Sequence, residues 1–492
     1  MLNLLVGEAG YRAALDLYFD RHDGQACTIE DWLKVFEDAT GRDLGQFKLW
    51  YEQAGTPRLS VTEEWDGETF RLTFAQHLPP TPGQSNKAPQ VIPVAMGLIG
   101  ADGTEVAPTQ VLALDRAQVS VAFKGLKARP VASLLRGGSA PVVLDHRPRP
   151  GDLAHLMAHD TDPVARWDAG HRLALEALAA MVVDGTDPGA EPVAGWIAAR
   201  APFLHENGLD PSYRALMLGL PGDEVIAAHL ARLGHVPDPD RIHAARGAAL
   251  DAIAQRFAEA LRELVATHAA TAPFSPDPAS AGRRALWGAG LGLLTRLDGG
   301  RAARAAFAAS DNMTDTLAAL GALARIGQGA AEFEDFHVRW QGERLVIDQW
   351  FTLQAATAAP ESALATVERL AAHPAFDWTN PNRFRALIGG FAGNHAGFHR
   401  ADGSGYAWLA DWLIRLDGRN PQFAARMSTA FESWRVEPEH GRDDRPDAGL
   451  TTWPRGGRAI DGASGRPVDG PSARLVRGGG PWHRRGSQAR RG

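Results

Sequence analysis

The spacing of apolar residues changes twice along this chain, and each change predicts a different kind of structure. Over residues 1–55 apolar side chains recur every three or four positions, which is the period of an α-helix. Over residues 56–146 they alternate with polar neighbours, as in strands with one buried face. From residue 147 to residue 435 the helical period returns. The pattern therefore predicts a mostly α-helical chain with one small all-β domain.

The first helical segment begins without a start signal. Leu2 and the apolar residues after it resemble the middle of a helix, with no Ser, Thr, Asp or Pro ahead of them. Another helix is predicted to begin at Thr28, where Thr-Ile-Glu-Asp forms a capping box closed by Asp31 in place of the usual glutamate. We expect residues 1–55 to be a helical piece whose beginning is missing.

Strict alternation is clearest in the second segment. Apolar residues alternate from Leu59 to Trp65 and again from Phe70 to Phe74, on either side of an Asp-Gly turn, which predicts a β-hairpin. Further strands are predicted at residues 91–99, 111–114, 119–123 and 142–144. Five to seven short strands in so short a segment favour a β-sandwich.

The third segment predicts a stack of helices. Roughly a dozen helical stretches joined by short polar loops, among them residues 153–182 and 240–267, indicate an α-helical superhelix of the solenoid type. A well-marked helix begins at Asn380-Pro381, an N-cap followed by proline in the first turn. Its apolar residues share one face, so Arg383 and Arg385 cannot both lie on that face. The glycines at 389, 390 and 393 suggest that another backbone packs closely there.

Residues 436–492 differ from everything before them. This tail holds eleven Arg, twelve Gly and no Lys, and it has no helical period. An arginine-rich arm could bind nucleic acid or an acidic surface. Arg, Gly, Pro and Ala without Lys is also what an alternate reading frame of GC-rich DNA encodes. We favour a frameshift product and expect a disordered tail.

Composition restricts the function classes. The net charge of −7 does not favour a nucleic-acid partner, and no apolar run is long enough to cross a membrane. The single cysteine, Cys27, excludes an internal disulfide and a cysteine-based metal cluster. The N-terminus lacks the basic region of a signal peptide. These features predict a soluble, cytoplasmic protein.

Candidate chemistry is sparse. His155 and His159 have the spacing of a zinc-binding His-Glu-x-x-His motif, but Leu156 occupies the position of the catalytic glutamate. We therefore predict surface or capping histidines and no metal site. Cys27 precedes a helix N-terminus, where a thiol pKa can fall, but we expect no catalytic role for it. The arginines Arg383, Arg385 and Arg426 could anchor a carboxylate, but their spacing alone favours solvent-exposed ion pairs.

Several ordered motifs resemble one family. They are Tyr-Phe-Asp-Arg-His-Asp-Gly at 18–24, Phe-Lys-Leu-Trp-Tyr-Glu-Gln-Ala-Gly-Thr-Pro at 47–57, Ser-Asp-Asn-Met-Thr-Asp at 310–315, Ile-Asp-Gln-Trp-Phe at 347–351, Asn-Pro-Asn-Arg-Phe-Arg at 380–385, Asp-Gly-Ser-Gly-Tyr at 402–406 and Arg-Asn-Pro-Gln at 419–422. From residue 1 to about residue 435 the chain resembles bacterial aminopeptidase N, a family of zinc peptidases that remove N-terminal residues from peptides.

The resemblance implies a domain architecture, and it also implies that the catalytic motifs of the family are missing from this chain. Residues 1–55 resemble the last helices of a thermolysin-like catalytic domain, residues 56–146 its β-sandwich, and residues 147–435 its helical superhelix. The family's Gly-x-Met-Glu-Asn and His-Glu-x-x-His motifs, its further zinc-ligand glutamate and its transition-state tyrosine do not occur in this chain. We therefore expect no cofactor here, although the family enzyme uses one zinc ion. Arg385 and Arg426 match arginines that line the family's substrate chamber.

Two hypotheses follow. In the first, the chain is the C-terminal fragment of an aminopeptidase N, which contributes the wall of the substrate chamber, is inactive alone, and meets peptide substrates only when the missing catalytic part complements it. In the second, it is a free-standing helical module that binds peptides or proteins. A reading frame upstream of Met1 that encodes His-Glu-x-x-His would favour the first.

Overall fold

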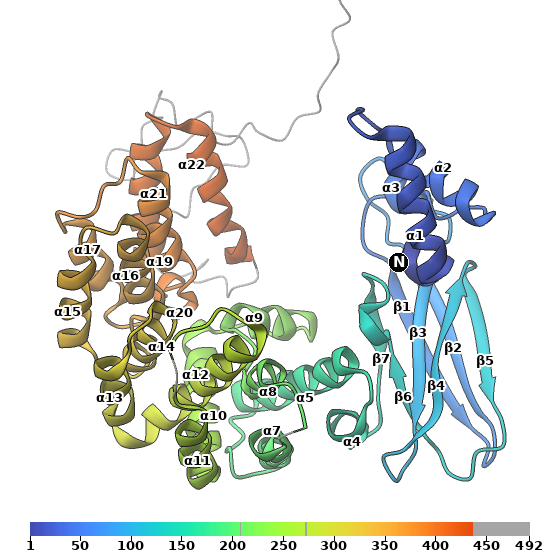
Figure 1. The fold of residues 1–492 in the computed structure, drawn as a ribbon, viewed down its shortest axis with the longest axis horizontal. Coiled ribbons are helices and arrows are strands. Elements are labelled where there is room, and N and C mark those ends of the chain that lie inside the picture. Colours follow the sequence, from blue (N-terminus) through green and yellow to red (C-terminus); the bar gives the residue numbers. More distant parts are fainter. Residues whose placement is uncertain (207, 271–272, 436–492) are drawn as a thin grey trace, which may run out of the picture. The chain divides into compact units, whose positions relative to one another are not determined.

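The computed structural model describes residues 1–206, 208–270 and 273–435, which fall into two compact units (Figure 1). Unit 1 comprises Met1–Ala174, and unit 2 begins at Leu175. The predicted tail at 436–492 lies outside the described residues. Helices together with one small β domain confirm the predicted fold class. Within the described ranges, no helix combines enough length and enough apolar residues to cross a lipid bilayer.

Unit 1 starts with three helices, α1 (Leu2–His22), α2 (Ile29–Thr40) and α3 (Leu49–Glu52). The predicted capping box is present, because Thr28 accepts a hydrogen bond from the Asp31 N–H while the Asp31 carboxylate accepts one from the Thr28 N–H. These helices share a core and reach the β domain through Trp50, whose indole N–H donates to the Val91 carbonyl at 2.8 Å.

The β domain is a sandwich of two sheets. One sheet has the order β5-β2-β1-β7 and the other β4-β3-β6. Their strands are β1 (Arg58–Trp65), β2 (Phe70–His77), β3 (Ile92–Ile99), β4 (Glu105–Leu114), β5 (Gln118–Phe123), β6 (Val131–Leu134) and β7 (Val143–His146). The predicted hairpin is confirmed, since β1 and β2 pair antiparallel with Trp65 opposite Phe70. Alternate residues of both sheets form the core, as the period of two requires. The short strand β6 was not predicted from the sequence.

Helices α4 (Asp152–His159) and α5 (Pro163–Val183) follow the sandwich. The predicted single helix 153–182 is therefore wrong. Proline at 163 lacks an N–H and disfavours helical geometry in the residue before it, so the helix stops and a new one starts. The predicted helix 240–267 is likewise divided, near Phe257, into α10 and α11.

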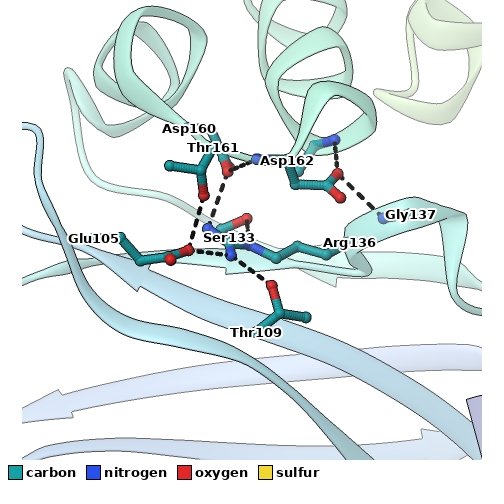
Figure 2. Close-up of polar contacts among 9 residues, drawn as sticks. Glu105, Thr109, Ser133, Arg136, Gly137, Asp160, Thr161 and Asp162 are labelled. Atoms are coloured by element: carbon teal, nitrogen blue, oxygen red, sulfur yellow. Dashed lines mark hydrogen bonds and ion pairs between the residues drawn. The ribbon is translucent and has the colours of Figure 1, made fainter.

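A buried polar network holds the α4–α5 connection against the sandwich (Figure 2). Arg136, only 2% exposed, forms ion pairs with Asp160 at 3.0 Å and with Glu105 of β4 at 2.6 Å. It also donates to the hydroxyls of Ser133 at 2.7 Å and Thr109 at 2.8 Å. The arginine therefore ties strands β4 and β6 to the loop between the two helices.

The same connection fixes the start of α5. The Asp162 carboxylate accepts hydrogen bonds from the Ala165 N–H at 2.8 Å and from the Gly137 N–H at 3.1 Å (Figure 2). The first of these bonds caps the helix, and the second attaches the cap to the turn that carries Arg136. The first turns of α5 are thus held on the β domain by side chains that are already paired.

Unit 2 is helical throughout its described part. Its elements after α5 are α6 (Val193–Ala198), α7 (Ala201–His205), α8 (Pro211–Leu218), α9 (Asp223–Arg232), α10 (Pro239–Arg256), α11 (Ala258–His268), α12 (Pro278–Asp298), α13 (Arg301–Ala309), α14 (Met313–Ala324), α15 (Ala330–Trp340), α16 (Arg344–Thr357), α17 (Ala363–Ala371), α18 (Pro381–Phe384), η2 (Arg385–Gly389), α19 (Gly390–Ala392), α20 (His395–Phe398), α21 (Ser404–Asp417), α22 (Pro421–Met427) and η3 (Ser428–Arg435). Helix α12 contacts α8, α10, α11, α13 and α14. One apolar core extends from α12 to α22.

Many of these helices begin at local signals. In the described part of unit 2, five helices start with an Asx-Pro pair whose Asp or Asn side chain accepts a hydrogen bond from a backbone N–H two or three residues later; the capping residues are Asp210, Asp238, Asp277, Asn380 and Asn420. Proline at the first helical position loses no hydrogen bond there. The short polar loops thus define where these helices begin.

Candidate functional site

The predicted channel residues lie on neighbouring elements of unit 2. Arg385 is the first residue of η2, a π-helical turn, and Arg426 belongs to α22. The Arg385 guanidinium lies 5.3 Å from the centroid of the Phe423 ring, and its Nη1 donates to the Asn382 side-chain oxygen at 3.3 Å. Phe423 precedes Arg426 by one turn of α22, so the helix that carries Arg426 also packs against Arg385.

Both arginines are exposed, and among the described residues neither has an acidic side chain within ion-pair distance. A guanidinium is always charged and presents several donors in a fixed planar fork. Each exposed guanidinium could therefore bind a carboxylate or another anion.

Arg383 behaves differently, as the helical pattern required of one of the two arginines. Its side chain is buried over the Phe351 ring, and it pairs with Asp348 and donates to the carbonyls of Ala375 and Arg344. All three of its guanidinium nitrogens donate to other groups of the protein. Arg383 therefore holds the helices together, while Arg385, two residues later, points away from that core.

The helical segment that carries Arg383 and Arg385 packs as its sequence predicts. Phe384, Leu387, Ile388 and Phe391 are all fully buried. Gly390 lies against α16, where an added Cβ would come within 3.3 Å of the Thr352 carbonyl oxygen. The predicted close approach of another backbone is thus confirmed at Gly390. A larger residue there would push away the segment that positions Arg385.

The two histidines with metal-like spacing pack on the β domain. Their rings are 4.8 Å apart on α4, and His155 Nε2 is hydrogen-bonded to the Gly100 carbonyl at 2.8 Å. His159 lies against Gly103, in the same turn between β3 and β4. Across the described ranges, no group of three or more His, Cys, Asp or Glu is placed to hold a metal ion. These donors do not fit a zinc site, and no zinc chemistry is assigned to them.

A pocket in unit 1 was missed by the sequence reasoning. It lies between the edge strands β6 and β7 and helices α4 and α5, and its enclosed volume of about 20 Å³ is about that of one water molecule. Its charged members are Asp168 and Arg172, four residues apart on α5. That spacing is visible in the sequence, but it is equally typical of an exposed helical ion pair.

Comparison with known proteins decides the family. A family model described as a domain of unknown function (DUF3458_C) with ARM repeats matches residues 150–443, and one described as a domain of unknown function (DUF3458) with an Ig-like fold matches residues 55–147. The chain belongs to the DUF3458_C family. Its β-sandwich and its stacked helices correspond to these two descriptions.

Two curated relatives carry the same name. Aminopeptidase N of Caulobacter vibrioides is 39% identical over 456 residues, which cover 90% of this chain and 51% of the relative. Aminopeptidase N of Escherichia coli is 36% identical over 448 residues, 87% of this chain and 50% of the relative. The crystal structure of Legionella pneumophila aminopeptidase A in complex with aspartic acid matches with a TM-score of 0.77 at 27% identity, over 88% of this chain and 51% of that one.

The chain thus spans about half the length of the curated relatives it matches. The predicted resemblance to the C-terminal portion of aminopeptidase N is confirmed.

Proposed function

We propose that this DUF3458_C chain serves an aminopeptidase and forms the part of its substrate chamber that contacts peptides. In this proposal residues 1–55 end a catalytic domain, residues 56–146 are the connecting sandwich, and residues 147–435 form the chamber wall. The hydrolysis itself belongs to zinc-binding residues supplied by another part of the enzyme. Peptides are the partners, and the cytoplasm is the location.

The observation that carries the proposal is that Arg385 and Arg426 are exposed and have no acidic partner among the residues that the structure describes. Every peptide ends in a carboxylate, and acidic side chains add more. An arginine can bind a carboxylate through two parallel hydrogen bonds, and a charge-assisted bond contributes roughly 1.5–3 kcal/mol. Loss of both arginines should therefore weaken the binding of an acidic peptide about tenfold or more.

Peptide binding by the full chain tests the arginines directly. Fluorescence anisotropy with a dye-labelled acidic tetrapeptide should show saturable binding, which the double variant Arg385→Gln/Arg426→Gln weakens at least tenfold. The matched control is Arg301→Gln, an exposed arginine on α13, which should leave the affinity unchanged. Equal affinities for the three proteins, or no binding to any of them, would overturn the assignment.

Zinc content and hydrolysis of an alanyl-anilide by the purified chain test whether the catalytic chemistry belongs to another part of the enzyme. For the purified chain alone we expect neither bound zinc nor turnover. When the portion of the Caulobacter vibrioides enzyme that this chain does not match is added, we expect turnover. Stoichiometric zinc together with turnover that is lost in His155→Ala would refute the assignment of the chemistry to another part.

A further inference from the structure

His373 lies in the connection between α17 and α18 and fixes the path of that connection. Its ring nitrogen Nδ1 accepts a hydrogen bond from the Ala375 N–H at 3.1 Å. The carbonyl oxygen of Ala375 accepts a hydrogen bond from the Arg383 guanidinium, which also pairs with Asp348 of α16. Ala375 is therefore bound on both sides, and its two bonds attach the connection to the first turn of α18 and, through Arg383, to α16.

The bond to Ala375 requires a neutral imidazole. A backbone N–H can only donate, so Nδ1 of His373 must offer its lone pair, and the single proton of the neutral ring is on Nε2. A protonated histidine carries a proton on both ring nitrogens. Two N–H groups would then face each other where the hydrogen bond now lies. One proton on His373 thus removes one of the two bonds that hold Ala375.

The rings around His373 offer no compensation for a positive charge on it. Its ring centroid lies 4.8 Å from that of His337, 5.2 Å from that of Trp350 and 6.0 Å from that of Phe351. These neighbours belong to α15 and α16, which pack side by side in unit 2 (Figure 1). The acidic residue of α16, Asp348, is already in an ion pair. The imidazole thus occupies an aromatic environment, and the nearby carboxylate of α16 is engaged elsewhere.

The charged side chains that face His373 are mostly positive. Partial burial lowers the pKa of His373, and the positive charges of His337 on α15, Arg369 on α17 and Arg383 on α18 lower it further. Glu334 on α15 is the negative group that acts in the opposite direction. His373 is therefore neutral at neutral pH, and it takes up a proton only below the ordinary histidine pKa of about 6.5.

We propose that the hydrogen bond between His373 and Ala375 is an acid-sensitive latch on the connection between α17 and α18. The neutral imidazole holds residues 372–380 against the start of α18. The protonated imidazole releases the Ala375 N–H, and the segment that leads to Arg383 loosens. The proposal does not rest on the proposed peptide site, because the latch consists of contacts within the stack of helices.

Acid opens this latch and does not close it. Since the pKa of His373 is lower in the folded chain than in the unfolded one, opening of the connection is accompanied by proton uptake. The stabilisation by the latch is complete above pH of about 6.5 and is lost as the pH falls below that value. The effect is local, so the rest of unit 2 should stay folded.

Amide hydrogen exchange of the full chain tests the latch, with protection taken relative to the intrinsic exchange rate at each pH. Between pH 7.5 and pH 5 the protection of residues 375–384 should fall at least about threefold, while that of α12 stays unchanged. In His373→Asn the amide oxygen can accept from the N–H two residues later but cannot be protonated, so the protection should be equal at both pH values. The matched control His235→Asn replaces an exposed histidine between α9 and α10 and should respond to pH as the unaltered chain does.

Two exchange results would overturn the proposal: equal protection of residues 375–384 at the two pH values in the unaltered chain, or an acid-induced loss that persists in His373→Asn. Nitrogen-15 NMR of the histidine rings gives a test that does not depend on the variant's stability. At pH 7.5 the Nδ1 of His373 should be unprotonated, and a proton on it would also refute the latch. The Arg385→Gln/Arg426→Gln variant should keep the pH response, so a failure of the peptide site and a failure of the latch are distinguishable.

Discussion

Replacing Arg136 by methionine should strongly destabilise unit 1. Methionine keeps an apolar stem of similar length but removes the charge, which leaves the Asp160 carboxylate without its cation. That side chain has no exposed surface, and its Oδ2 already lacks a hydrogen-bond partner among the described residues. Breaking a buried ion pair by removing one partner costs about 3–5 kcal/mol. The bond to Glu105 adds little to this figure, because that carboxylate is partly exposed.

Urea unfolding of the full chain, monitored by hydrogen exchange in residues 92–114 and 131–160, measures this loss of unfolding free energy within unit 1. Adding Asp160→Asn to the Arg136→Met variant should restore part of the stability, because the uncompensated charge is then gone. The double-mutant cycle isolates the coupling between the two side chains. A loss below about 1 kcal/mol for Arg136→Met, or no coupling in the cycle, would refute the role of this network.

Two further predictions concern the β3–β4 turn and acid stability. Gly103→Ala should destabilise unit 1 by about 1 kcal/mol more than Gly125→Ala. Both glycines have positive φ (82° and 74°), but only at 103 would the new Cβ meet a neighbour, 2.6 Å from His159 Nδ1. Equal melting temperatures for the two variants would contradict this packing. The hydrogen bond from Arg400 lowers the pKa of Asp402 to about 2. Asp402 therefore stabilises the fold above its unfolded pKa of about 3.9 and loses this effect as the pH falls toward 2. In Asp402→Asn, unfolding of unit 2 should depend less on pH in that window, and an unchanged acid profile would count against the ion pair.

The features that could be predicted from the sequence are those encoded locally. The capping box at Thr28 and the hairpin around residues 66–69 depend on side chains within a few positions of one another. The buried face from Phe384 to Phe391 follows from helical spacing alone. Such patterns need no knowledge of what packs against them, which is why they were interpreted correctly.

The features that were missed depend on contacts distant in the sequence. Spacing required that Arg383 and Arg385 separate, but only the position of Asp348, on another helix, decides which one is buried. The pocket brings together β6, β7, α4 and α5, and no local pattern announces it. The division of the predicted helix 153–182 is the exception, because proline at 163 is a local signal that the helical period outweighed.

The Asx-Pro starts of unit 2 have a consequence for how this fold can diverge. Each pair closes its hydrogen bond within three residues, so the start signal stays with its own helix. Extra residues placed before such a pair lengthen the preceding connection and leave the helical register unchanged. The entropic cost of a longer flexible loop grows slowly, by about 0.6 kcal/mol for each doubling of its length. Descendants of this sequence can therefore acquire new loops between helices while the stacked helices persist.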